Sequence, residues 1–78
     1  MRARADQQWT ERIKRLLKAE LSRRGITYRE LSARLDAIGV HETEDNINKK
    51  IARGSFTAVF FFQCMEAIGC QTLRLHDD

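Results

Sequence analysis

Residues 27–54 read TYRELSARLDAIGVHETEDNINKKIARG, and this stretch decides the fold. Thr27 followed by Glu30 has the spacing of a capping box, in which two residues exchange side-chain to backbone hydrogen bonds at a helix start. Apolar residues at helical spacing come next, and Gly39 can leave the helix with a positive φ. The pattern predicts a helix from Thr27 to about Ile38.

A second helix is predicted from Thr43 to about Arg53. Ile47 and Ile51 lie four residues apart, so they share one face, and Gly54 follows as a helix stop. Two short helices joined by a glycine-containing turn, in a basic protein of 78 residues, are typical of a helix-turn-helix.

The N-terminal part adds one more predicted helix. The chain is long enough for one domain and has no proline, which favours an all-α fold. Residues 1–7 are predicted to be a flexible basic arm, and residues 8–78 a single helix-turn-helix domain. The first helix should run from about Gln8 to Arg24, with an apolar stripe of Trp9, Ile13, Leu16, Leu17 and Leu21.

One carboxylate falls on this apolar stripe. Glu20 projects onto it at about 100° per residue, and we expect it at the rim of the core, paired with Arg24 or Arg34.

The C-terminal part contains a very apolar helix and a short extended segment. The helix should begin at a cap provided by Ser55 or Thr57 and end near Ile68, with Phe61 and Met65 on its inner stripe. Residues 70–75 alternate between apolar and polar side chains, which predicts a short strand.

The apolar surface of this last helix allows two interpretations. It can be the central helix of the core, which accounts for most of its apolar residues. Alternatively, part of the surface is reserved for a homodimer contact, formed by Val59, Phe62, Leu73 and Leu75.

Charge is distributed unevenly. Residues 1–34 contain ten Arg or Lys against four Asp or Glu, whereas the remainder of the chain is net acidic. A basic N-terminal half favours a polyanionic partner, nucleic acid before membrane. Cys64 and Cys70 lack the spacing of a zinc site and fit reduced thiols of a cytoplasmic protein. No metal, cofactor or catalytic pattern is indicated, and we expect no enzyme.

The helix at 43–53 would present its outer face to DNA. The predicted base contacts are Asn46, Lys49, Arg53, Asp45 and Glu42, because amide, guanidinium and carboxylate groups suit base edges. The predicted phosphate contacts are Tyr28, Arg29, Lys50, Ser55, Arg2 and Arg4. The acidic residues at the start of this helix offset its dipole, but they also repel phosphate.

Two family resemblances follow from these residues. The order of helices around Leu31 and Arg53-Gly54 resembles the lambda-repressor-like (Xre-type) helix-turn-helix domains, which implies an all-α fold of four or five helices whose third helix enters the major groove. The connection between Leu35 and Ile47 is longer than in typical repressors, and Leu21 and Ala52 replace an ion pair. The run Asn46, Lys50-Ile51, Arg53-Gly54, Phe56, Phe60-Phe61, Gln63-Cys64, Ala67-Ile68-Gly69 is similar to a small bacterial family catalogued only as a domain of unknown function.

Two functions are therefore open. The first is a dimeric, nucleoid-associated regulator that reads double-stranded DNA through helix 43–53. The second is a protein-interaction module of the same fold, which uses its Phe-rich helix 57–68 and its C-terminal strand.

Overall fold

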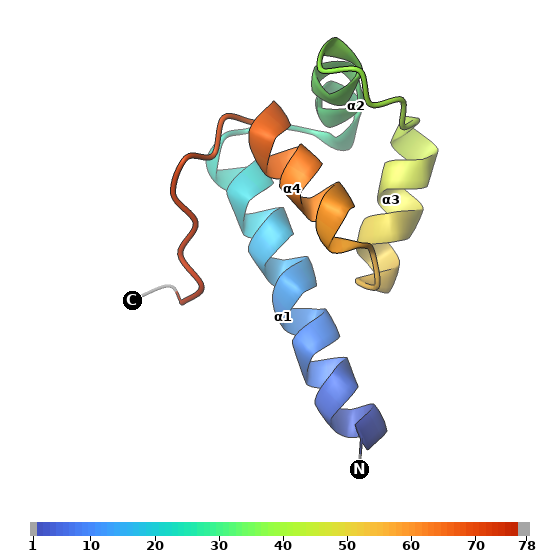
Figure 1. Cartoon of the computed structure of the whole chain (residues 1–78), viewed down its shortest axis with the longest axis vertical. Coiled ribbons are helices and arrows are strands. Elements are labelled where there is room, and N and C mark those ends of the chain that lie inside the picture. The colour runs from blue at the N-terminus through green and yellow to red at the C-terminus, as the bar shows by residue number, and fades with distance from the viewer. Residues whose placement is uncertain (1, 77–78) are drawn as a thin grey trace.

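The computed structural model describes the backbone of residues 2–76 and the side chains of residues 7–76. It contains four helices, α1 (Arg2–Arg23), α2 (Tyr28–Ala37), α3 (Glu44–Arg53) and α4 (Ala58–Ala67). The other three helices gather around the C-terminal half of α1, and the N-terminal half of α1 projects beyond them (Figure 1). This projection gives the molecule its long axis of 41 Å.

The all-α prediction is confirmed, and two of its details are wrong. The backbone is helical from Arg2, so α1 begins six residues before the predicted start and includes the segment expected as an arm. Alanine, arginine and glutamine in this segment are good helix formers. Residues 70–76 form no strand, because the structure offers them no partner strand; they fold back beside α1, and Leu73 packs against the core (Figure 1).

Three threonines cap the helices that follow α1. The hydroxyls of Thr27, Thr43 and Thr57 each accept a hydrogen bond from the amide three residues later, at 3.0–3.1 Å. Thr57 rather than Ser55 is therefore the cap of α4. Only half of the expected capping box forms at Thr27, because the carboxylate of Glu30 accepts from Arg34 at 3.2 Å instead.

Three helices end with the same hydrogen bond. The amides of Ile26, Val40 and Cys70 each donate, at 2.9 Å, to a carbonyl five residues earlier in the preceding helix. This is the Schellman stop, which turns the residue after the glycine back toward the core. Ile26, the residue after Gly25, is 7% exposed and belongs to the core.

The core lies where α2, α3 and α4 meet the C-terminal half of α1. Its fully buried side chains are Leu17, Leu31, Leu35, Ile47, Ile51 and Cys64. Ile47 and Ile51 thus face inward as predicted.

Two aromatic side chains are placed differently from the prediction. Phe60 is buried, whereas Phe61 is only partly buried at the edge of the core and stacks on Phe56, because α4 is phased so that residues 60, 64 and 68 face the core. Trp9, expected on the buried stripe, is 62% exposed, since it lies on the projecting part of α1.

None of the helices in the described part of the chain has the length and apolar character needed to cross a membrane.

Glu20 is a buried carboxylate rather than a rim residue. Its side chain is 3% exposed and receives hydrogen bonds from Arg24 at 2.5 Å and Arg23 at 2.9 Å; Arg34 pairs elsewhere. The hydrogen bond from Arg24 outweighs the effect of burial and holds the pKa of the Glu20 carboxyl below its usual value. Deprotonation of Glu20 is thus coupled to folding.

The Glu20→Gln substitution is expected to cost about 1–3 kcal/mol at pH 7, since it removes hydrogen bonds to a charged group. Because the pKa of Glu20 is lower in the folded state, its contribution is complete above the unfolded pKa of about 4.3 and is lost as the pH falls. Urea titrations from pH 7 to pH 2 should show the difference between wild type and variant narrowing in acid. Glu30→Gln, at an exposed pair, is the control; a difference independent of pH would contradict the assignment.

Candidate nucleic-acid interface

The outer face of α3 is open to solvent. Asn46, Lys49 and Arg53 are all exposed, on the side opposite the buried Ile47 and Ile51. These three residues are the polar and basic part of the predicted base-reading set. α3 therefore presents a helix surface that other elements of the described chain leave uncovered.

The start of α2 lies beside the first half of α3. One shallow hollow is lined by Tyr28, Thr43, Asp45 and Asn48, and a second by Arg29 and Asn46 among others. Burial raises the pKa of the Tyr28 hydroxyl, which therefore stays protonated and can donate a hydrogen bond. The structure thus brings two predicted phosphate contacts next to two predicted base contacts.

The sequence predicted Glu42 on the outer face of α3, and this prediction is wrong. It precedes the Thr43 cap, its carboxylate accepts from Lys50, and its side chain is 15% exposed. The hydroxyl of Ser32 donates to the carbonyl of Glu42 at 2.6 Å and fixes this turn. Of the three acidic residues near the start of α3, which are Glu42, Glu44 and Asp45, Glu42 is therefore withdrawn from the surface.

Lys50 is likewise committed to the interior side of α3. Besides pairing with Glu42, its ammonium group lies 4.7 Å from the centroid of the Phe60 ring. A cation over an aromatic face is attracted by the ring's quadrupole. The side chain of Lys50 is thus held by Phe60 of α4 and by Glu42 of the α2–α3 connection. No sequence pattern predicts this pairing, since Glu42 precedes the helix that carries Lys50.

The remaining acidic residues stay at the surface. The carboxylate of Asp45 lies 3.1 Å from the ammonium of Lys49, with both side chains well exposed. An exposed pair of this kind contributes little free energy, because water and salt screen it. Glu44 is also exposed in the first turn of α3. The outer face of α3 and the start of α2 together carry a nearly balanced charge.

The end of α3 is fastened to α1. The ammonium of Lys14 donates to the carbonyl of Ala52 at 3.2 Å, and Gly54 lies directly against Thr10. Arg53 and Ser55 are exposed on either side of this contact. The backbone of Arg2 and Arg4 lies in the projecting part of α1. The side chains of these two predicted phosphate contacts lie outside the described part of the structure.

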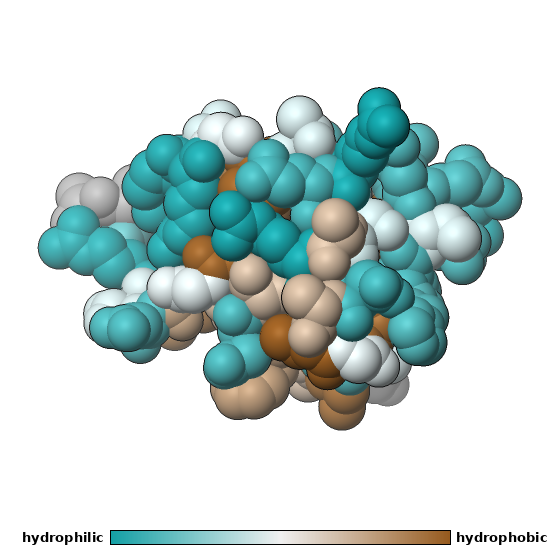
Figure 2. Space-filling model, turned by 90° about the horizontal axis from the view of Figure 1, so that it is seen from above, coloured by the Kyte–Doolittle hydropathy of each residue, from teal (hydrophilic) through white to brown (hydrophobic). Residues whose placement is uncertain are grey.

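The four residues predicted for a dimer contact are separated into two groups. Val59, Phe62 and Leu75 are 65%, 71% and 67% exposed, whereas Leu73 packs partly against its own core. Seen from above, apolar side chains gather toward one edge of the molecule, and most of the remaining surface is hydrophilic (Figure 2). Val59, Phe62 and Leu75 are therefore exposed apolar residues, whereas Leu73 contacts the core of its own chain.

Cys64 is buried in the core, whereas His41 lies at the surface. Burial raises the pKa of Cys64 to about 12, so this residue stays a thiol in the core. His41 lies 2.6 Å from the carboxylate of Asp36 on the surface. No group of three or more metal-ligating side chains occurs among residues 7–76.

Comparison with known proteins identifies a family. The model of a domain of unknown function (DUF6471) matches residues 9–73. Neither the curated proteins nor the solved structures yielded a match. The matched segment includes the packed part of α1, the α2–α3 pair with its open face, and α4. The chain therefore belongs to the DUF6471 family.

Proposed function

We propose that this protein is a DNA-binding regulator in which α2 and α3 act as a repressor-like helix-turn-helix. The observation that carries the proposal is the open outer face of α3, from which Asn46, Lys49 and Arg53 project, with the start of α2 beside the first half of this helix. An α-helix fits the major groove, and these side chains suit adenine and guanine edges. A regulator of this kind would be associated with the nucleoid.

The electrostatics of the surface are compatible with DNA once the ion pairs are considered. The pairing of Glu42 with Lys50 removes one carboxylate from the approach of a phosphate backbone. The Asp45–Lys49 pair is exposed and weak, so Lys49 can exchange its carboxylate partner for a base or phosphate. Glu44 and Asp45 remain and limit affinity, which favours recognition through base edges over strong non-specific binding.

Phosphates would be held at the two ends of the motif. Tyr28 and Arg29 lie at the N-terminus of α2, where free amides and the helix dipole attract anions. Arg53 and Ser55 lie at the end of α3 and are exposed. Lys50, committed to Glu42 and Phe60, is not part of this proposed contact set.

Arg53→Ala and Lys49→Ala are each expected to weaken binding to a preferred duplex by about 1–3 kcal/mol if the residue contacts a base. Arg34→Ala is the matched control, because it removes the same charge from an exposed pair with Glu30 on α2. Fluorescence anisotropy on a selected duplex measures all three. Equal losses for Arg34→Ala and Arg53→Ala would show that only net charge matters, and unchanged affinity in both α3 variants would place the DNA elsewhere.

A homodimer is part of the proposal. Val59 and Phe62 lie one helical turn apart on α4, and residues 54–65 contain no charged side chain, so two copies can meet there without like-charge repulsion. Sedimentation at micromolar concentration should show a dimer that Phe62→Ser converts to monomer. A wild-type protein that sediments only as a monomer would remove the dimer.

The second candidate function is a protein-interaction module. The 71% exposure of Phe62, with Val59 beside it, is the observation that favours it. Titration of a random duplex at low and at moderate salt separates the two functions, because phosphate contacts weaken steeply as salt rises. Absence of binding even at low salt would favour the interaction module over the DNA-binding regulator.

A further inference from the structure

A ridge of four exposed side chains runs along α1. Trp9, Arg12, Arg15 and Lys18 follow one another at every third residue, which places them on one continuous row of the helix surface. Along the axis of α1 the row rises about 14 Å at 1.5 Å per residue, and it winds across the outer side of the helix, because three residues fall short of a full turn of 3.6. We call these four residues the α1 ridge.

The cations of the α1 ridge are not neutralised by carboxylates. Arg15 and Lys18 take part in no ion pair among residues 7–76, in contrast to Lys49 and Lys50 on α3. Glu11 lies beside the ridge, and its carboxylate is turned to Lys14 at 3.4 Å. The ridge is therefore a more strongly positive surface than the outer face of α3.

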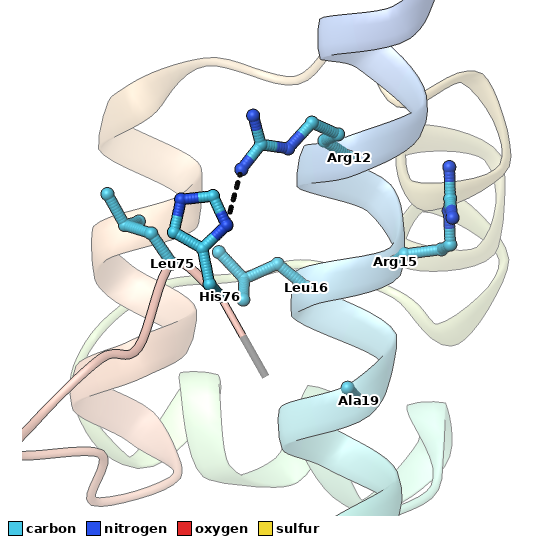
Figure 3. Close-up of a pocket in the computed structure, with 6 residues that line it drawn as sticks. All are labelled: Arg12, Arg15, Leu16, Ala19, Leu75 and His76. Atoms are coloured by element: carbon cyan, nitrogen blue, oxygen red, sulfur yellow. Dashed lines mark hydrogen bonds between the residues drawn. The ribbon is translucent and has the colours of Figure 1, made fainter. Parts of the chain in front are cut away.

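Trp9 adds an aromatic surface to this row. The guanidinium of Arg12 lies over its ring, 4.9 Å from the centroid, and the tryptophan is 62% exposed. Arg12 also contacts His76 at 3.5 Å, beside a hollow between α1 and the C-terminal segment that is lined by Leu16, Ala19 and Leu75 (Figure 3). Arg15 points to the other side of α1, so the ridge winds around the helix (Figure 3).

We propose that the α1 ridge is a second nucleic-acid surface, which holds a single strand. Arg12, Arg15 and Lys18 contact successive phosphates, and an unpaired base stacks on Trp9. Cations interleaved with an exposed aromatic ring match a strand with free bases better than an acidic peptide, which offers no planar ring. This surface is separate from the proposed duplex site on α3.

Trp9 is the only tryptophan, so its fluorescence reports binding directly. Addition of an oligothymidine of eight nucleotides should quench it, with a salt slope of about −2 for three phosphate contacts at about −0.7 each. The double variant Arg15→Ala/Lys18→Ala should reduce that slope by about 1.4. Trp9→Leu, followed by anisotropy of a labelled strand, should weaken binding by about fivefold to a hundredfold, the range of one base stack.

The matched control is Arg29→Ala/Arg53→Ala, which removes two exposed cations from the α2–α3 face and should leave strand binding unchanged. Circular dichroism checks that each variant remains folded. No quenching at low salt would overturn the proposal. Equal quenching by polyglutamate of the same charge would instead indicate an acidic protein partner, and a larger loss in the control than in the ridge variant would place the strand on α3.

Discussion

Replacing Phe60 by alanine is expected to lower the free energy of unfolding by about 3–5 kcal/mol. Phe60 is 3% exposed, its ring meets the edge of Phe56 at 5.6 Å, and the ammonium of Lys50 lies over it. A domain of this length has a total stability of about 4–12 kcal/mol, so the loss is a large part of the whole. Urea denaturation followed by circular dichroism measures it.

Phe62→Ala is the matched control, since it makes the same chemical change on the same helix. Phe62 is 71% exposed in the single chain, so its loss should change stability by less than about 0.5 kcal/mol at a protein concentration too low for the proposed dimer to form. A comparable loss of stability in both variants would contradict the placement of Phe60 in the core and of Phe62 at the surface of the single chain. If the Phe62→Ala loss grew with protein concentration, Phe62 would be buried between two copies.

Gly54→Ala is expected to cost about 2–5 kcal/mol. Gly54 has a φ of +70°, which costs a residue with a Cβ about 1–2 kcal/mol. The added methyl would also lie 2.6 Å from Cγ2 of Thr10 and 2.9 Å from its backbone carbonyl oxygen. Such overpacking adds about 1–3 kcal/mol and forces α3 away from α1. Thermal and urea unfolding both report the loss.

Gly25→Ala separates the two contributions. Gly25 has nearly the same φ, +66°, but a methyl group there would meet no atom within 4 Å. Its substitution should therefore cost only the backbone term of about 1–2 kcal/mol. Equal losses at the two glycines would mean that α1 does not pack tightly against the end of α3.

The helices and their ends could be predicted from the sequence because their causes are local. Thr27 and Thr43 are caps whose partners lie three residues away, and Gly39 and Gly54 follow the last helical turns. The inward orientation of Ile47 and Ile51 likewise follows from helical spacing alone. The same local rules correctly predicted that Asn46, Lys49 and Arg53 lie on the outer face of α3.

Other features depend on how the helices pack, which spacing does not determine. Trp9 continues the apolar stripe of α1, yet the helices around α1 do not extend far enough to cover it. Glu42 and Lys50 meet because the α2–α3 connection turns back toward α4. Whether Phe60 or Phe61 faced the core depended on a small rotation of a helix that is apolar around most of its surface.

The most direct test of the proposed function is amide mapping by NMR. A ¹⁵N-labelled sample titrated with a duplex at low salt should show saturable shift changes centred on Arg29, Asn46, Lys49 and Arg53. These changes should fade as the salt concentration rises, because phosphate contacts release counterions. Shift changes confined to Val59 and Phe62, or no changes at low salt, would contradict the assignment of α3 as the DNA-reading helix.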